Sequence, residues 1–184
     1  MRVTISMDGV LGRYAGALAA MPSKARSTMA IGLNSGGRAI RRETIAAETA
    51  QTGLRAGTIR RAQVEKRASP GHLEYEIWAK GGNVRLKYFG ARETRAGVSA
   101  APWNQRQVFP GTFIKGGRFP KRVGLGMGGH VFRREGADRL PIQGGRSGLY
   151  IPTELITGQT AAAFQAGAAK VGPIVVARLG SLLP

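Results

Sequence analysis

The sequence predicts an α+β fold with helices first, a central antiparallel β-sheet or small barrel next, and a helix at the C-terminus. Apolar residues recur at steps of three and four up to residue 62 and again after residue 153, which is typical of amphipathic helices. Between these limits apolar and polar residues alternate, as in half-buried strands. The 184 residues suit one structural domain, which we divide into a helical region 1–62, a β region 63–152 and a C-terminal helix 153–184.

The helical region opens with a short strand over residues 1–7, and Asp8 is placed to cap a helix that starts at Gly9. The longest predicted helix covers residues 22–51. Its Gly36–Gly37 pair costs about 1 kcal/mol per glycine relative to alanine, so the pair marks a bend or a close contact. Gly53 ends this helix, and a short basic segment follows over residues 54–61.

The β region starts with a predicted meander over residues 63–90. Residues 63–69 form an edge strand, residues 73–78 a strong strand, and Gly81–Gly82–Asn83 a hairpin turn into the next strand, which ends or bulges at Phe89–Gly90. On the exposed faces we expect cross-strand pairs of opposite charge, which add a few tenths of a kcal/mol each. The residues concerned are Glu74 and Glu76 on one strand, with Arg85 and Lys87 on the other.

A glycine-rich basic hairpin tip is predicted at residues 115–129. A strand over residues 107–114 leads into it, and extended segments at residues 131–133 and 140–142 follow it. Six of the fifteen tip residues are glycine and four are basic. Such a segment cannot bury enough apolar surface to order itself, so we expect the tip to be mobile until it meets another subunit or protein.

The C-terminal segment carries an apolar stripe at helical spacing, and Gly172–Pro173 is expected to kink or split the helix. A stripe of this kind is typical of a core face or an oligomer seam. Its members are Phe164, Ala168, Val171, Val175, Leu179 and Leu182.

Charge is the most informative part of the composition. The formal net charge of +18 favours a polyanion or an acidic protein as a partner, although it is also compatible with a solvated basic surface. No apolar run reaches 18 residues, so no membrane partner is expected. The absence of cysteine excludes disulfides and thiolate metal sites. The helix–turn–helix spacing near residues 51–61 is a weak indication of base-specific DNA recognition, because the second segment is short.

Residues for catalysis are scarce. The two histidines, His72 and His130, would need acidic partners to hold a metal, and Glu74 and Glu76 are better explained as strand-surface residues. No phosphate-binding loop and no nucleophile-elbow motif occurs. We therefore expect no enzyme activity, no cofactor and no metal.

The β region resembles the phage minor tail protein Z family, whose members carry a strand followed by a basic loop. The first matching motif is Phe89, Gly90, Ala91, Arg92, Thr94, Gly97, Val98, Ser99 and Ala100. The second is Pro110, Gly111, Phe113 and Ile114, followed by Val131, Phe132, Arg134 and Gly136. The third is Arg139, Leu140, Pro141 and Ile142, with Gly148 and Pro152. The match covers about residues 83–152, and the helical region is similar in character only.

The resemblance implies a structural virion protein of a tailed bacteriophage. Such a minor tail or tail-completion protein forms a ring, most often of six copies, at the head-proximal neck of the tail, after assembly in the host bacterial cytoplasm. It would help to join tail to head and to pass DNA, beside terminator, tube, tape-measure or head-connector proteins. The alternative function is a sequence-nonspecific nucleic-acid-binding module, which the arginine clusters favour.

Two sets of candidate site residues follow from the charge and the stripe. The DNA-facing candidates are Arg38, Arg41, Arg42, Arg55, Arg60 and Arg61. The subunit-interface candidates are Lys115, Arg118, Lys121 and Arg122 at the tip, and Phe164, Val171, Val175, Leu179 and Leu182 on the C-terminal stripe.

Overall fold

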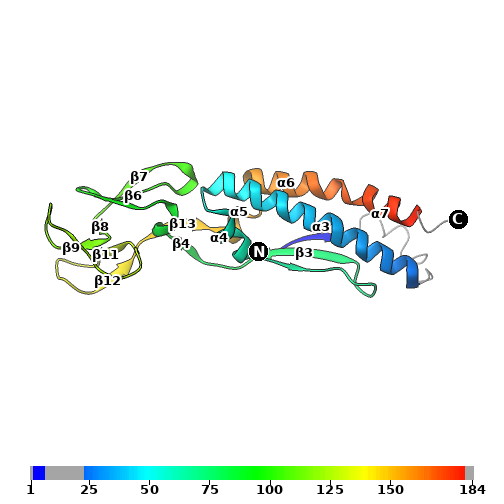
Figure 1. Cartoon of the computed structure of the whole chain (residues 1–184), viewed down its shortest axis with the longest axis horizontal. Coiled ribbons are helices and arrows are strands. Elements are labelled where there is room, and N and C mark those ends of the chain that lie inside the picture. Colours follow the sequence, from blue (N-terminus) through cyan, green and yellow to red (C-terminus); the bar gives the residue numbers. More distant parts are fainter. Residues whose placement is uncertain (1, 7–22, 181–184) are drawn as a thin grey trace.

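The computed structural model describes residues 2–6 and 23–180, and it confirms the α+β fold class. The molecule is elongated, with long helices and a three-stranded sheet at one end and several small antiparallel sheets at the other (Figure 1). No closed barrel occurs within these two ranges. The predicted helix from Gly9 and the stripe residue Leu182 lie outside the described residues.

Helix α3 (Ser23–Thr52) is the longest helix of the helical end and matches the prediction for residues 22–51 closely. It ends where Gly53 adopts φ +75°, a conformation that side chains disfavour. Helices α6 (Gly158–Ala169) and α7 (Val171–Gly180) run back along α3 (Figure 1). The expected split is present, because Pro173 cannot donate to the carbonyl of Ala169, one turn earlier.

The Gly36–Gly37 pair serves close packing on two sides of α3, as one of the two predictions for it proposed. A Cβ on Gly36 would lie 3.1 Å from a methyl group of Val171 on α7. A Cβ on Gly37 would collide with the ring of Tyr75 in the neighbouring sheet. The two glycines therefore let a helix and a sheet approach α3 at the same level.

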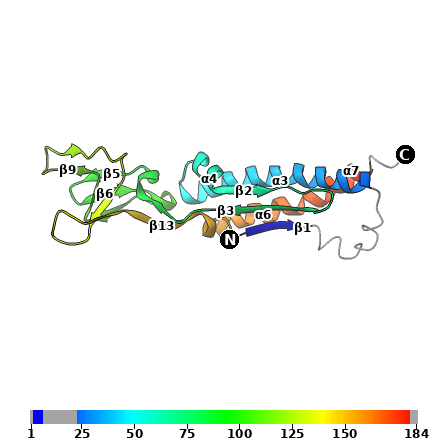
Figure 2. The same ribbon diagram turned by 90° about the horizontal axis from the view of Figure 1, so that it is seen from below.

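The sheet beside α3 joins the first strand to the start of the β region. Its strand order is β1 (Arg2–Ser6), β3 (Glu74–Ala79), β2 (Gln63–Lys66), all antiparallel. Figure 2 shows this sheet lying along α3 and α6 as a second layer. Tyr75 and Ile77 on β3 are fully buried in the core that this layer shares with the helices.

The predicted pairing of residues 73–78 with the strand that follows is wrong. Both edges of β3 are already occupied, by β1 and β2, so β4 (Asn83–Arg85) pairs with β13 (Arg146–Tyr150) instead. Glu76 consequently faces Thr4 and Lys66 across the sheet. The expected ion pairs with Arg85 and Lys87 do not form.

The rest of the β region consists of short elements beyond β4. These are the 3₁₀ turn η1 (Leu86–Phe89), β5 (Arg92–Thr94), β6 (Gly97–Ala100), the 3₁₀ turn η2 (Pro102–Asn104), β7 (Gln107–Pro110), β8 (Thr112–Phe113), β9 (Lys115–Gly116), β10 (Val123–Gly124), β11 (Phe132–Arg134) and β12 (Ile142–Gly144). They form the sheets β5–β6–β7, β12–β11–β8 and β10–β9. Gly111, at φ +69°, breaks the single strand expected over residues 107–114.

A second core lies where the two ends of the molecule meet. It includes Leu54, helix α4 (Ala56–Ala62) through Ile59, and helix α5 (Ile151–Glu154) through Ile151. Beyond it, the distal sheets leave many large apolar side chains in solvent. The exposed ones are Val108, Phe119, Val123, Leu125, Met127 and Leu140.

Helices α6 and α7 together, Gly158–Leu179, are long and apolar enough to cross a membrane by length and composition alone. In this structure the same stretch packs along α3. Phe164, Val171 and Val175 are buried in that contact.

Candidate functional site

A basic groove lies between α3, α4 and the start of the β region. Its cavity has a volume of about 630 Å³ and, alongside a few apolar side chains, is lined by five arginines and one acid: Arg38, Arg41, Arg42, Arg60, Arg67 and Glu65. Arg38, Arg42 and Arg60 are exposed. We call this cavity the α3–α4 groove. Three free guanidinium groups on its wall can take phosphate or carboxylate oxygens.

Arg41 differs from its neighbours because its guanidinium is used by the fold. Its Nη2 donates to the carbonyls of Arg60, at 3.2 Å, and Gln63, at 2.9 Å. Its Nη1 lies 3.7 Å from Glu65. These bonds connect α3 to the junction of α4 and β2. Arg41 therefore maintains the shape of the groove, and its guanidinium is not directed at a ligand.

Glu65 is the acid of the α3–α4 groove, and it is held by three side chains. Tyr75 donates a hydrogen bond to Glu65 Oε2, and the Arg67 guanidinium lies 2.9 Å from Oε1. Burial alone would raise the pKa of Glu65, but the bonds from Tyr75 and Arg67 and the charge of Arg41 bring it below its usual value. Burial and Glu65 raise the pKa of Tyr75 in turn. The acid therefore stays ionised, and it offsets part of the positive charge of the groove.

A second basic groove opens beside η1, with a volume of about 390 Å³. It is lined by Arg55, Thr58, Arg61, Lys87, Tyr88, Gly90, Gly128 and Gly129. We call it the η1 groove. Arg60 lines the first groove, whereas Arg55 and Arg61 line the second, so α4 contributes to both. The structure thus divides the six DNA-facing candidates into a set of four and a set of two.

His130 lies between two cations next to the η1 groove. Arg85 Nη1 is 2.9 Å from His130 Nδ1, and Lys87 Nζ is 2.7 Å from His130 Nε2. Desolvation, Lys87 and Arg85 all lower the pKa of His130, so the imidazole is neutral near pH 7. No pattern in the sequence predicts this cluster, because Arg85 and Lys87 meet His130 only through the fold.

At the tip, the structure separates Arg122 from the other three candidates. Lys115, Arg118 and Lys121 are exposed. Arg122 Nη1 lies 2.6 Å from Glu93 on β5, and its side chain is 18% exposed. Glu93 also accepts the backbone N–H of Lys115 at 3.0 Å. This one acid therefore fastens both strands of the tip hairpin.

The C-terminal candidates lie mostly inside the chain's own core. Phe164, Val171 and Val175 are buried against α3, and Leu179 packs at the edge of that cluster. The stripe is therefore a core face, which was one of its two predicted roles. These side chains are not available to a second subunit while α7 stays on α3.

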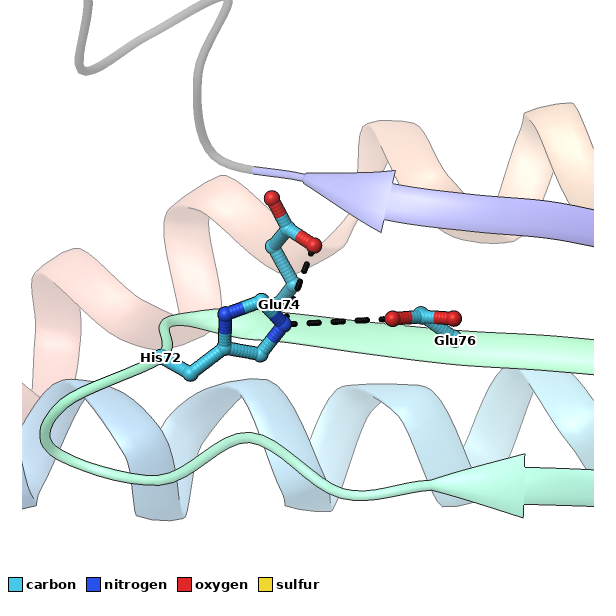
Figure 3. A group of neighbouring side chains, drawn as sticks. All are labelled: His72, Glu74 and Glu76. Carbon is cyan, nitrogen blue, oxygen red and sulfur yellow. Dashed lines mark ion pairs between the residues drawn. The ribbon is translucent and has the colours of Figure 1, made fainter.

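Three potential metal ligands meet near the start of β3, although the sequence favours a strand-surface role for Glu74 and Glu76. His72, Glu74 and Glu76 offer ligand atoms that all lie within 4.8 Å of one another (Figure 3). The alternation of these residues along one strand was the available signal. However, Lys66 Nζ lies 3.1 Å from Glu76 Oε1 and 3.4 Å from His72 Nε2. The Lys66 ammonium group thus already contacts two of the three potential ligands.

Comparison with protein-family models, curated proteins and solved structures found no match for this chain. Its function has to be inferred from its own residues.

Proposed function

We propose that the chain is a structural subunit of a multi-copy assembly, of the type that the resemblance to the minor tail protein Z family implies. In that role it is a minor tail or tail-completion protein of a tailed bacteriophage. Copies form a ring at the head-proximal end of the tail, where they help to join tail to head and to pass DNA.

The exposed apolar surface of the distal sheets is the observation that carries this proposal. Val123 is 71% exposed and Leu140 is 67% exposed, and Phe119, Leu125 and Met127, close to Val123 in sequence, are exposed as well. The β9–β10 ribbon has only two strands of two residues each, and an isolated ribbon of this size has little stability in water. Several large exposed apolar side chains on a segment with little stability of its own are typical of an interface that a neighbouring subunit completes.

The elongated shape and the charge support the same function. The tip hairpin and the helical end lie at opposite ends of the molecule, so one subunit can contact different neighbours at each (Figure 1). Copies that each carry a formal charge of +18 repel one another. A ring of such chains therefore needs acidic neighbours or a polyanion, and DNA passing through a tail neck supplies one.

The test is the mass of the purified full chain at modest salt, measured by light scattering and native mass spectrometry. We expect one discrete multimer. Val123→Asp places a charge in the distal apolar surface and should shift the population to monomer. Val176→Asp is the matched control, since Val176 is 64% exposed on α7, away from the distal sheets.

Two results would overturn the assembly proposal. One is a wild-type chain that stays strictly monomeric both in solution and in particles. The other is a discrete multimer that Val123→Asp and Val176→Asp weaken equally, because the distal apolar surface would then not be the interface. Thermal unfolding of both variants shows whether each is folded.

A second candidate function, sequence-nonspecific nucleic-acid binding, is favoured by the two basic grooves on either side of α4. Arg38, Arg42 and Arg60 should contact phosphate, which makes binding insensitive to sequence and steeply dependent on salt. Replacing these three by serine should weaken DNA binding and lower the salt slope by about 0.9 per lost phosphate contact on duplex DNA. Unchanged affinity and slope would assign the α3–α4 groove to an acidic protein or to solvent.

A further inference from the structure

His130 has too few acceptor atoms for the groups around it. A neutral imidazole has one nitrogen that accepts a hydrogen bond and one N–H that donates. Arg85 and Lys87 offer only donors, one to each ring nitrogen, at 2.9 Å and 2.7 Å. Whichever tautomer is present, one cation therefore faces an N–H group. In the part of the chain that the structure describes, no carboxylate forms an ion pair with this cluster.

The strand pairing concentrates more positive charge at the same place. Arg85 lies directly opposite Arg146 in the β4–β13 pair, and like charges in that position repel. Arg146 is held by a bond to the carbonyl of Asn83 at 2.8 Å, which is a neutral partner. Within the described residues, none of the ion pairs involves Arg85, Lys87 or His130. The fold gathers these cations without supplying an acid.

The cluster is open to the η1 groove, which Lys87 also lines. Arg55 and Arg61 add two guanidinium groups to that groove, and both are exposed. Gly128 and Gly129, the two residues before His130, line it with backbone and no side chain, at φ +59° and +69°. A bulky oxyanion can approach closely here.

We propose that Arg85, Lys87 and His130 form a binding site for one phosphate group of a nucleic-acid backbone. The phosphate oxygens accept hydrogen bonds from Arg85 and Lys87. They also accept a hydrogen bond from the imidazole N–H, which faces a cation when no ligand is bound. Adjacent phosphates of the strand then lie along the η1 groove, within reach of Arg55 and Arg61. This site does not depend on ring formation, and it is separate from the α3–α4 groove.

An extended polyanion explains the surroundings better than a small anion does. A free phosphate needs only the three residues at the site. The cations instead continue from the cluster through the η1 groove to the two arginines that α4 contributes there. A nucleic-acid strand carries charge at regular spacing along such a line. A carboxylate-rich protein segment is the competing partner, and the test below separates the two.

Binding at this site should take up a proton. Without a ligand, desolvation, Lys87 and Arg85 lower the pKa of His130. A bound phosphate adds negative charge beside the ring, which favours imidazolium and raises that pKa. A backbone phosphodiester keeps one charge throughout the neutral range, so any pH dependence of its binding there comes from the protein. Affinity should therefore rise as pH falls from about 8 to about 6, by up to about tenfold per unit of pKa change.

The experiment titrates the full chain with a short single-stranded oligonucleotide and follows the imidazole protons by NMR. The chain has two histidines, and His72→Gln assigns the signals. In wild type we expect the His130 signal to shift on binding and its pKa to rise. Arg85→Met with Lys87→Met should lower the salt slope by about 0.7, which corresponds to the loss of one phosphate contact on a single strand.

Two histidine variants test the role of His130, and three probes distinguish between the possible ligands. His130→Gln should abolish the pH dependence of binding, whereas His72→Gln should retain it. An oligonucleotide that saturates the protein without moving the His130 signal overturns the proposal, and this result needs no variant. If polyglutamate moves the His130 signal and the oligonucleotide does not, the partner is an acidic protein. If inorganic phosphate alone moves that signal, the ligand is a free anion. Either result also overturns the proposal.

Discussion

The ring of Tyr75 on β3 lies against the bare α-carbon of Gly37 on α3, and the Tyr75 side chain is fully buried there. The phenol of the same residue donates a hydrogen bond to Glu65 on the neighbouring strand β2. One side chain thus links the helix–sheet contact to the acid of the α3–α4 groove. The groove keeps its shape only while α3 and the sheet stay this close.

Gly37→Ala should destabilise the protein. The added Cβ would lie closer to the Tyr75 ring than the 3.0 Å that real Cβ atoms keep, so helix and sheet must separate. We expect the free energy of unfolding to fall by about 1–3 kcal/mol, as for other overpacked cores. Gly57→Ala on α4 is the control, because nothing lies within 4 Å of its added Cβ. Chemical denaturation measures both, and equal stability of the two variants would contradict the contact.

Glu48 should make the protein less stable as pH rises. Burial raises the pKa of Glu48 to about 7, with Glu154 adding to the rise and a bond from Gln63 opposing it. The folded state then holds a proton that the unfolded state releases above about pH 4.5, the usual pKa of a glutamate side chain. The free energy of unfolding should drop between about pH 4.5 and 7, by about 2–3 kcal/mol.

Glu48→Gln tests this prediction, since it keeps the shape and removes the charge. The variant should match wild type below about pH 4.5 and exceed it in stability above about pH 7. Denaturation at a series of pH values measures the difference. A difference that does not change with pH would mean that the pKa of Glu48 is the same in the folded and the unfolded protein, which would contradict the prediction.

Arg41 and Arg42 are adjacent in sequence but should behave differently. Arg41→Met leaves the carbonyls of Arg60 and Gln63 without their donor, which should cost about 1–3 kcal/mol of stability. Arg42 is exposed, so Arg42→Met should change stability by less than about 0.5 kcal/mol. Thermal unfolding compares the two. If Arg42→Met proved the more damaging, the roles inferred for the α3–α4 groove would be reversed.

The tip should be cut by trypsin in the free chain, and Glu93 should control how fast. Arg118 and Lys121 are exposed, whereas Arg122 is paired with Glu93. We expect cleavage in residues 115–129, with faster cleavage in Glu93→Gln because both strands lose their anchor. Glu135→Gln is the control, as Glu135 is an exposed acid near the next hairpin. Equal protection of free and assembled wild-type protein would contradict the prediction that the tip is mobile.

Local pattern was enough to predict the helices, because each is set by neighbours in sequence. The stripe on α3, the stop at Gly53 and the break before Pro173 all depend on residues within a few turns. Strand pairing was not predictable in this way. β3 pairs with β1, and β4 pairs with β13, so both partners come from distant parts of the chain. A turn signal at Gly81–Gly82 could not exclude either arrangement.

The candidate site was predictable in composition but not in geometry. The clusters of arginine in the sequence predicted which residues lie around α4. Nothing in the sequence shows that Arg41 donates hydrogen bonds to backbone carbonyls, whereas Arg42 is exposed to solvent. The His130 cluster was missed for the same reason, since Arg85 and Lys87 were assigned to acids that belong to another sheet. Which charges neutralise each other is decided by strand order.

The packing of α7 on α3 also fixes the order in which the chain can fold during synthesis. Val175 and Val171 fill the space above Gly32 and Gly36, yet the ribosome makes them long after α3 has emerged. Until then the apolar face that carries Met29, Leu33 and Ile40 lacks the part of its cover that α6 and α7 provide. Closing so long a loop is slow, so a nascent or truncated chain presents this face to chaperones and proteases. A chain that terminates before α7 should therefore be more sensitive to proteases than the full chain.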